Sequence, residues 1–600
     1  MRSTLILLLI VVIFVIHCLS LNFTQDDAFI SYRYVENLIQ GNGLVFNQGE
    51  RVEGYTNFLW IILLSIFAGL GLDIILVSKI LGIASGCLTL FLLHRISRLF
   101  FSKRDWWLAL FPPFLLTVSS AFAYWSTSGL ETTFFTAMVL LSVYLYLTYS
   151  RLWVVSCAVS ALIRPEGVLI FGILLLHRLL FGRRRLGESP LHIAGFVLLL
   201  LPFAVFKVSY YGDILPNPFY AKIGLSFDYI VSGLGYFWTF LKHYGLWGIL
   251  YVVPVFFFRR LGSGERLLAL LVYVYTLYVI VIGGDVLSGH RFFVPVLAPL
   301  YLLVTALVQS AYASFKSSFG MTVVLTLDLF VISGVFFLIP QKSIRSARDA
   351  EDHLVQEMRS IAEYLSDDHG SDFSVALTTI GSASYHLGTG VKVIDMLGLT
   401  DRHIARHPEK MEGIVATWKE RKYNTRYVLS LDPDFILFST GYKPSAPAER
   451  ALLLNSKFRE NYYALPMHVR QREFIPIFRK RGIYSKDNEV FSDAGFAELF
   501  CQAIHLQYRG RIREAIDRLK QVDSAGPQDF GLVPELLGRV YFLLKDYPTA
   551  ETYLKKAIRI DDRTVLAHAY LEAICRETGR TAEAEAERRK VLFYDPSFRW

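Results

Sequence analysis

Apolar residues come in long runs separated by short polar loops over the first 340 residues of the chain. The first run, 5–21, is followed by a polar loop, 22–56. Runs of roughly 15–22 apolar residues are long enough to cross a hydrocarbon core of about 30 Å as helices. Together with the first run, about eleven spans are expected. The other spans are predicted at approximately 75–93, 106–122, 131–149, 152–163, 166–181, 190–209, 245–258, 266–283, 291–312 and 320–339.

Three apolar stretches differ from an ordinary membrane span. The run 5–21 is not followed by the small-residue site at which signal peptides are cleaved, so we interpret it as a retained anchor. Residues 57–71 are apolar but short and end in glycines, so we expect a helix along the membrane surface. The pair 152–163 and 166–181 is interrupted by Arg164-Pro165, and one long kinked element is an alternative to two spans.

Composition supports a membrane protein. Hydrophobic residues make up 53% of the chain, above the 45–50% or so of soluble domains, and the mean hydropathy is +0.40. The formal net charge of +9 lies in short loops between apolar runs, which indicates membrane orientation rather than nucleic-acid binding. The five cysteines have no paired spacing for a zinc site or a disulfide framework, so they do not indicate a compartment.

Basic residues occur in alternate loops of the apolar part. By the positive-inside rule these loops and the amino terminus are cytoplasmic. An odd number of spans then places 341–600 outside, in a multi-pass protein of the inner membrane. The alternation holds only if 57–71 does not cross. The basic loop residues are His94, Arg95, Arg98, Lys103 and Arg104; Arg151; Arg178, Arg183, Arg184 and Arg185; Arg259, Arg260 and Arg266; and Lys316.

The first part of the polar tail, 341–495, alternates helical and strand-like patterns. A helical pattern covers 351–365. Short strand-like runs occur at 373–377, 391–394 and 427–430. This alternation predicts a small extracytoplasmic α/β domain.

The second part of the tail, 496–600, is repetitive. Its middle copy has the residue offsets of a tetratricopeptide repeat, whose period is about 34 residues. Three helical hairpins are expected, either binding a protein partner or packing as a cap on the preceding domain. The residues that fit the offsets are Gly538, Tyr541, Ala550, Leu554 and Ala557.

Polar and ionisable residues gather in the loops that this topology places outside. Asp26 and Asp27 form an adjacent carboxylate pair a few residues beyond the first span, which places acid/base chemistry at a water–lipid boundary. Ionisable groups near membrane depth are costly, so their presence indicates function. The other candidate site residues are Arg33, Glu53, Tyr55, Glu131, Arg164, Asp213, Asn217, Asp285, His290 and Arg291.

Several candidates also have a purely structural interpretation. Carboxylates such as Asp26 and Asp27 often cap helices or stand in turns. Arg33 could pair with the glutamates of its own loop, and Glu131 could cap the helix that it begins.

Turn formation or lipid contact could explain some of the remaining candidates but not Arg164. Asp213 and Asn217 flank prolines, which suggests a turn. Arg291 could snorkel to the lipid headgroups. Arg164 lies between two apolar half-helices with no obvious partner besides Glu166, so we interpret it as a lipid-phosphate ligand.

Taken in order, these motifs resemble bacterial membrane glycosyltransferases of the GT-C fold. Within that group the chain is most similar to the terminal β-(1→2)-arabinofuranosyltransferases of mycobacterial cell-wall synthesis and their relatives. The resemblance covers about 1–340 and, more weakly, 394–401, whereas the repeat tail departs from the mycobacterial pattern. The motifs are DDAFISYRY at 26–34, GLVFN at 43–47, ERVEGYTNFLW at 50–60, SGLE at 128–131, RPEG at 164–167, YGDILPN at 211–217 and GGD at 283–285.

The resemblance implies an inverting transfer of a sugar from a polyprenyl-phosphate donor to a glycan, lipid or protein acceptor. Asp26 or Asp27 would be the general base, a role worth about 10²–10⁴-fold in rate. The phosphate would be held by Arg164, Arg291, His290 or Arg33. The sequence does not require a divalent metal near the carboxylates, although it is compatible with one.

Two other functions fit a polytopic protein. A transporter or lipid flippase would carry inverted repeats and charges near the bilayer midplane. We find no internal hydropathy symmetry, and the candidate residues lie at one face. An envelope assembly scaffold would need fewer spans than eleven for anchoring.

Overall fold

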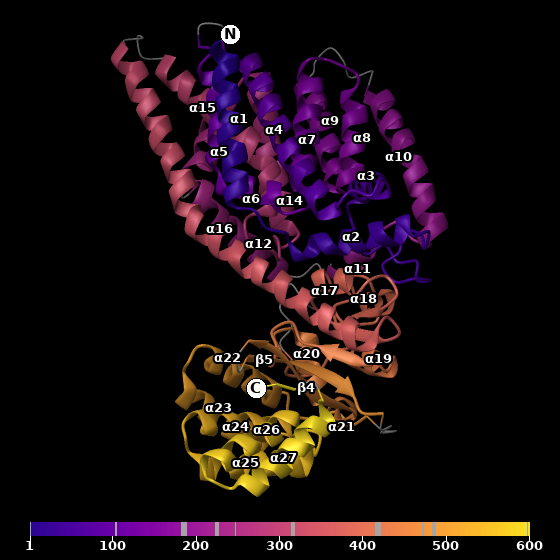
Figure 1. Cartoon of the computed structure of the whole chain (residues 1–600). Coiled ribbons are helices and arrows are strands. Elements are labelled where there is room, and N and C mark those ends of the chain that lie inside the picture. Colours follow the sequence, from indigo (N-terminus) through magenta and orange to yellow (C-terminus); the bar gives the residue numbers. More distant parts are fainter. Residues whose placement is uncertain are drawn as a thin grey trace. The chain divides into compact units, whose positions relative to one another are not determined.

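The computed structural model describes residues 2–102, 105–181, 189–222, 227–245, 248–313, 319–414, 422–470, 473–482, 488–596 and 598–599. The chain divides into two compact units, Met1–Pro216 with Ile223–Met358, and Asn217–Lys222 with Arg359–Trp600. Figure 1 shows the chain with its elements labelled. Several basic loop residues used above to predict orientation lie outside the described residues. These are Lys103, Arg104, Arg183, Arg184, Arg185 and Lys316.

The first unit consists of helices joined by loops in its described residues, and residues 40–57 form the longest of the described loops. Helices occupy every run that the hydropathy pattern marked as apolar. Two further helices were not predicted: α2, within the expected polar loop 22–56, and α12, before the run 245–258. The helices are α1 (Arg2–Ser20), α2 (Asp26–Ile39), α3 (Phe58–Gly69), α4 (Ile74–Phe100), η1 (Leu108–Leu110), α5 (Phe111–Val118), α6 (Ser120–Thr127), α7 (Thr132–Leu147), α8 (Trp153–Ile163), α9 (Glu166–Phe181), α10 (Ser189–Tyr211), α12 (Phe227–Tyr244), α13 (Ile249–Phe256), η4 (Phe258–Arg260), α14 (Ser263–Val281), η5 (Arg291–Phe293), α15 (Val294–Ala313) and α16 (Phe319–His369).

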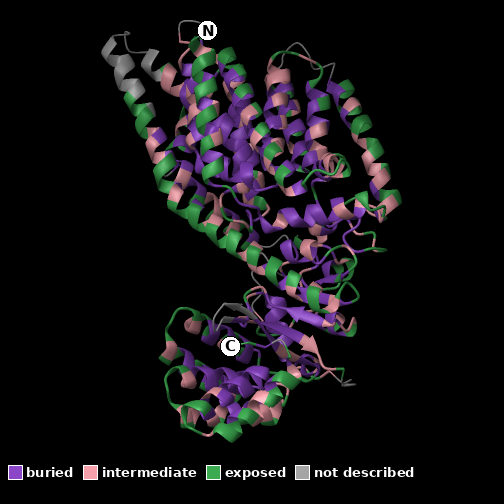
Figure 2. Cartoon of the chain, viewed as in Figure 1, coloured by how far each residue is buried: buried purple, intermediate pink, exposed green. Residues whose placement is uncertain are grey.

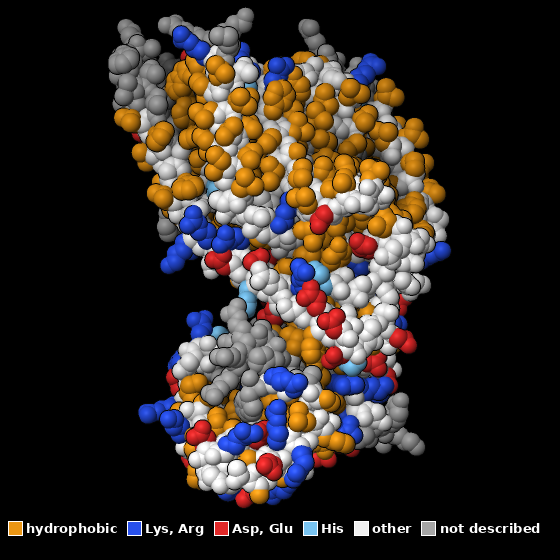
Figure 3. Space-filling model, in the orientation of Figure 1, with side chains coloured by type: hydrophobic (Ala, Val, Ile, Leu, Met, Phe, Trp, Pro, Cys, Tyr) orange, Lys and Arg blue, Asp and Glu red, His pale blue; other side chains and the backbone are white. Residues whose placement is uncertain are grey.

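Five helical segments in the described residues are long and apolar enough to span a membrane. They are α1, α4, α10, α14 and the segment Arg291–Ser310. The expected span 106–122 is instead bent by 62° between α5 and α6, which together could form a sixth. Ser119 at the bend has an extended backbone. Hydrophobic side chains cover much of the visible outer surface of this unit (Figure 3), as expected for helices that face lipid.

The break at Arg164-Pro165 separates α8 from α9. Arg164 has an extended backbone, because the proline ring that follows excludes the helical region for the preceding residue. The two helices then pack closely, since a Cβ placed on Gly167 would lie 2.2 Å from the Ala161 nitrogen. Only glycine fits this contact. The structure therefore has two helices here rather than one kinked element.

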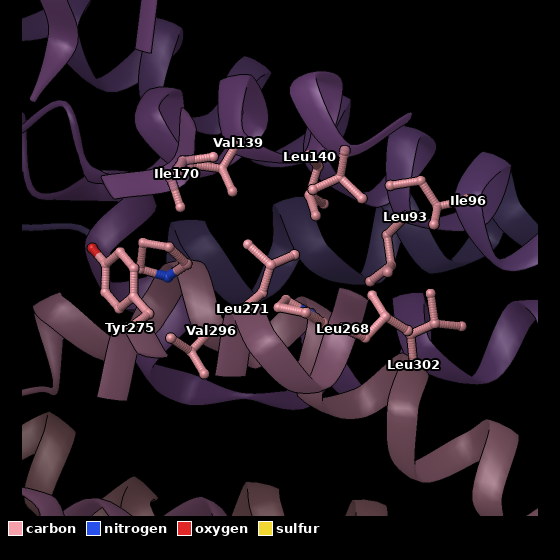
Figure 4. A pocket seen from close by; sticks show the side chains of 13 residues that line it. Leu93, Ile96, Val139, Leu140, Ile170, Leu268, Leu271, Tyr275, Val296 and Leu302 are labelled. Carbon is pink, nitrogen blue, oxygen red and sulfur yellow. The ribbon is translucent and has the colours of Figure 1, made fainter. Parts of the chain in front are cut away.

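An apolar pocket lies in the core of the first unit, where α4, α7, α9, α14 and α15 meet (Figure 4). Its cavity measures about 10 Å³, which is roughly the room for one water molecule. The pocket is therefore a packing gap and not a substrate site. The residues that line it are Leu93, Ile96, Val139, Leu140, Val143, Ile170, Leu268, Leu271, Tyr275, Pro295, Val296, Pro299 and Leu302.

The described part of the second unit contains a five-stranded mixed sheet with strand order β2-β1-β3-β5-β4. Strand β1 pairs in parallel with β2 and β3, so that Ala376 lies opposite Ile394 and Ile436. Strand β5 is antiparallel to β3 and β4. The strands are β1 (Ser374–Leu377), β2 (Lys392–Asp395), β3 (Phe435–Leu437), β4 (Tyr462–Arg470) and β5 (Glu473–Lys480).

One predicted strand of this unit is wrong, and one hairpin was missed. Residues 427–430 lie in a helix, α19 (Thr425–Ser430), because the Asn424 side chain accepts a hydrogen bond from the Tyr427 amide and caps a helix there. The hairpin of β4 and β5 was not predicted. The short helices of this unit are α11 (Asn217–Lys222), α17 (Ser382–His386), α18 (Arg402–Arg406), α20 (Pro447–Leu454) and α21 (Ser456–Asn461).

Six helices at the end of the second unit pack as consecutive pairs, α22 with α23, α24 with α25 and α26 with α27. Gly538 lets α24 approach α25, since a Cβ there would lie 2.5 Å from the Leu554 side chain. One continuous hydrophobic core runs from the sheet into these helices (Figure 2). The helices are α22 (Gly495–Tyr508), α23 (Ile512–Ala525), α24 (Leu532–Leu543), α25 (Tyr547–Ile560), α26 (Val565–Glu577) and α27 (Thr581–Tyr594).

Candidate active site

The carboxylate pair forms the first turn of α2, which lies across the ends of other helices of the first unit, away from the amino terminus (Figure 1). Carboxylates suit this position because a helix amino terminus carries partial positive charge. The two residues differ in access. Asp26 is buried, with 7% of its surface exposed, whereas 36% of the Asp27 side chain is exposed. Of the pair, Asp27 is the carboxylate that a substrate can more readily reach.

Arg291 lies at the end of the loop that precedes α15, and its side chain reaches the first turn of α2. Its Nε and Nη2 donate to the two carboxylate oxygens of Asp285, at 2.8 and 2.9 Å. Its Nη1 lies 3.7 Å from the Asp27 Oδ2. Two parallel hydrogen bonds to one buried carboxylate fix the guanidinium plane. Arg291 is therefore held by Asp285 and presents its remaining nitrogen to Asp27, so the interpretation that it only snorkels to headgroups is wrong.

Arg164 is the centre of a second ion-pair group. Its Nη1 donates to Glu131 at 2.7 Å, and its Nη2 and Nε donate to Glu166 at 3.0 and 3.3 Å. All three residues are buried. The structure thus adds Glu131 to the single partner, Glu166, that the sequence suggested, and two carboxylates already neutralise this guanidinium.

Glu131 does not cap its helix. It stands at the N-cap of α7 without a side-chain capping bond. Its carboxylate instead accepts hydrogen bonds from Arg164 and from the Asn57 Nδ2, the latter at 2.9 Å. Asn57 also exchanges hydrogen bonds with Ser31 of α2. Glu131 therefore links Arg164 to the first loop.

Aromatic rings lie between and beside the two arginines. The Phe292 ring centroid is 5.2 Å from the Arg164 Cζ and 5.3 Å from the Arg291 Cζ. Trp125 lies 5.7 Å from Arg291, and its indole donates to the Gly289 carbonyl at 2.6 Å. These ring faces favour the guanidinium positions through cation–π attraction.

His290 precedes Arg291 in the left-handed backbone region, with φ of 60°. Its Nε2 lies 2.8 Å from the His243 Nδ1, and its ring is buried among aromatic residues. Burial lowers the pKa of His290 to about 3. The imidazole is therefore neutral at physiological pH, so it offers a hydrogen bond but no positive charge to an anion.

Three other candidates form a separate group at the end of α10. Glu53 pairs with Lys207 at 2.9 Å, and burial raises the pKa of Glu53 to about 7, a shift to which the negative charge of Asp213 adds. Tyr55 and Tyr211 share a hydrogen bond at 3.0 Å, and Tyr211 also donates to the Leu44 carbonyl. These contacts attach the first loop to α10.

Arg33 is almost completely buried beneath the same loop. Its Nε donates to the Phe46 carbonyl at 2.8 Å, and its Nη2 donates to Asn47 at 3.4 Å. Its guanidinium also lies 4.9 Å from the Phe46 ring centroid.

Asn217 lies in the second unit and not with Arg291. Its Nδ2 donates to the carbonyls of Gly398, Leu399 and Asp401 at 2.8, 3.0 and 3.1 Å. The same loop is held by Asp395, which accepts hydrogen bonds from the amides of 397, 398 and 400. Burial raises the pKa of Asp395 to about 6. Asn217, the first residue of α11, is therefore held by the 394–401 motif of its own unit.

One residue of the site was not a sequence candidate. Glu351 of α16 accepts a hydrogen bond from the Asp26 amide at 2.7 Å. Burial, together with the negative charges of Asp26 and Asp27, raises the pKa of Glu351 to about 7. In the sequence Glu351 is one of several charged residues in a polar helical pattern, so no local signal marks it.

A divalent metal has no evident binding site in the part of the chain that the structure describes. No three His, Cys, Asp or Glu side chains there are arranged to hold one.

The described part of the first unit contains the long apolar helices of a polytopic membrane protein, and a carboxylate–arginine cluster lies at the start of α2. The structure is similar to that of ArnT from Cupriavidus metallidurans in the apo state, with a TM-score of 0.53 and 12% identity over 80% of this chain and 98% of ArnT. The ArnT structure bound to undecaprenyl phosphate matches with a TM-score of 0.51 and 11% identity, over 79% of this chain and 97% of ArnT. At these identities the likeness shows the fold alone.

In sequence, the chain is similar to proteins named terminal β-(1→2)-arabinofuranosyltransferase, which confirms the resemblance inferred from its motifs. It is 30% identical to that of Mycobacterium tuberculosis over 251 residues, covering 37% of this chain and 38% of the relative. It is 28% identical to that of Corynebacterium glutamicum over 339 residues, covering 46% and 47%. The chain thus matches less than half the length of these relatives. Residues 344–487 match a family described as a domain of unknown function, DUF8728.

Proposed function

We propose that this chain is an inverting glycosyltransferase that moves a sugar from a polyprenyl-phosphate donor to a hydroxyl of an extracytoplasmic glycan, lipid or protein. The observation that carries the proposal is the accessible Asp27 carboxylate 3.7 Å from Arg291, whose guanidinium is fixed by Asp285. A carboxylate base and a cation that stabilises a leaving phosphate therefore belong to the same cluster, and a displacement at an anomeric carbon uses both groups.

Asp27 is assigned as the general base. The base must reach a hydroxyl of a bound acceptor, and Asp27 is the more exposed of the pair. Asp26 is buried, and its amide is bound to Glu351. We assign Asp26 to holding the first turn of α2 rather than to proton transfer.

In the proposed step, the acceptor hydroxyl transfers its proton to the Asp27 carboxylate while its oxygen attacks the anomeric carbon. The bond from that carbon to the phosphate oxygen breaks, and its electron pair stays on the phosphate. Arg291 stabilises the negative charge that develops there. Arg164 is already bound to two carboxylates, so we assign it to holding Glu131 and Phe292 in place rather than to binding the phosphate.

The relatives support the donor class. A structure of ArnT, the similar fold, is bound to undecaprenyl phosphate, and the sequence relatives are named as arabinofuranosyltransferases. We therefore propose that the isoprenoid lies in the bilayer and that the sugar lies on the extracytoplasmic side of the inner membrane, next to the loop 22–56. Polyprenyl-phosphate arabinofuranose is the first donor to test.

For the tail we propose an α/β domain over 341–495 and a tetratricopeptide-like array over 496–600, both extracytoplasmic. The three helix pairs and the close contact at Gly538 support the repeat assignment. The array shares its core with the sheet, so it acts as a cap on the α/β domain. Its outer surface remains available to a protein partner.

The experiment that tests the function measures sugar transfer by purified protein in liposomes from synthetic polyprenyl-phosphate sugars. Asp27→Asn keeps size but removes the proton acceptor, so transfer should fall by at least about 100-fold while donor binding changes little. Asp26→Asn should lose less transfer activity than Asp27→Asn. Asp349→Asn, on the exposed face of α16, is the matched control and should behave like wild type. Near-wild-type transfer by D27N, or no transfer by wild type from any polyprenyl-phosphate sugar, would contradict the proposal.

A further inference from the structure

A carboxylate from the far end of the first unit's sequence reaches the carboxylate pair. Glu351 is separated from Asp26 by 325 residues, yet its Oε1 lies 2.7 Å from the Asp26 amide nitrogen. Glu351 belongs to α16, beyond the apolar part of that helix, and is partly buried where it meets α2. Its other neighbours are Gln25, Asp27 and Tyr124.

The first turn of α2 lacks a local side-chain cap. The amide groups at the start of a helix have no partner within the helix and need an acceptor from elsewhere. Gln25 occupies the N-cap position, but its side chain makes no capping hydrogen bond. The Glu351 carboxylate supplies an acceptor to the residue immediately before Asp27. The orientation of this turn thus depends on a contact from α16.

We propose that Glu351 is a positioning residue of the transfer reaction: by accepting the Asp26 amide hydrogen bond it holds the first turn of α2 so that Asp27 faces Arg291. The inference rests on the proposed function, because Asp27 is the base only in that function. Glu351 itself touches no reacting atom. Its effect is on the direction in which the Asp27 carboxylate points.

The test compares two substitutions at this position. Glu351→Gln keeps an oxygen that accepts the Asp26 amide, whereas Glu351→Ala removes it. We expect E351Q to retain kcat within about threefold of wild type and E351A to lose about 10- to 100-fold, with the donor KM changed little in both, because misplacement of a reacting group by about 1 Å costs this much. Glu357→Ala is the control, because Glu357 lies further along α16 and pairs with His353. Its kcat and donor KM should match those of wild type.

Hydrogen exchange of the amides of 25–28 gives a second measurement that does not require transfer. E351A should exchange faster there than wild type and E351Q, while the rest of the first unit keeps its protection. Wild-type exchange and kcat in E351A would overturn the proposal, as would an E351Q variant as impaired as E351A. A wild type without transfer would refute the glycosyltransferase function alone, since the exchange comparison would still decide the role of Glu351.

Discussion

Asp285→Asn is the substitution that most directly tests how Arg291 is held. Asp285 is buried, and its two carboxylate oxygens accept from Arg291 at 2.8 and 2.9 Å. Removing one partner of a buried ion pair costs about 3–5 kcal/mol, because the other charge is left uncompensated. Asparagine keeps one acceptor oxygen, so we expect about 3 kcal/mol, the lower end of that range.

The substitution should also affect the reaction. Asp27 is a second carboxylate near Arg291, at 3.7 Å, so we expect a guanidinium released by Asp285 to move toward it. That movement pairs the base with a cation and withdraws the cation from the phosphate. We therefore expect D285N to raise the donor KM and to lower kcat, whereas D27N lowers mainly kcat.

The assay combines thermal unfolding of the purified protein in detergent with transfer kinetics at several donor concentrations. Asp349→Asn is the matched control, since Asp349 is 63% exposed and pairs with Arg348 at the surface. Exposed pairs of this kind contribute about 0–1 kcal/mol. If D285N and D349N both kept wild-type unfolding temperatures and donor KM, the assignment of Asp285 as the support of Arg291 would be refuted.

Three further predictions concern packing, pH and orientation. Gly167→Ala should prevent α8 and α9 from packing and so reduce the folded yield in size-exclusion chromatography, whereas Gly172→Ala, which meets nothing within 4 Å, should be neutral. Burial raises the pKa of Glu53 from 4.5 to about 7, so its contribution to stability is present below about pH 4.5 and is lost as the pH rises through 7. The free energy of unfolding of Glu53→Gln should therefore gain on that of wild type between pH 5 and 8, by on the order of 3 kcal/mol, and a constant difference would contradict this. Reporter fusions after residues 50, 104 and 345 should be outside, inside and outside, and a cytoplasmic signal after 345 would refute the predicted orientation.

Local patterns of the sequence were sufficient for much of the architecture. Apolar runs predicted helices where the structure has them, because a lipid-facing helix needs a continuous apolar stretch of known length. Arg164-Pro165 predicted the break between α8 and α9 through a restriction on one backbone angle. The bend between α5 and α6 was not predicted, since the run 106–122 contains no proline or glycine near Ser119.

In the second unit, local signals competed with one another. The aromatic and β-branched residues of 427–430 suggested a strand, but Asn424 caps a helix there. The hairpin of β4 and β5 was missed, although it forms through a regular antiparallel register. Strand pairing is decided by the partner strand more than by intrinsic preference.

The sequence by itself determined which ionisable residues stand between the apolar runs and that Asp26 and Asp27 begin a segment beyond the first run. Only the tertiary structure decided their partners. It paired Arg291 with Asp285 and Arg164 with Glu131, placed Asn217 with the 398–401 loop, and brought Glu351 to Asp26. The reason is physical: helix formation and membrane insertion depend on residues near one another in the chain, whereas a buried charge takes its partner from whichever distant helix the packing brings within about 3 Å.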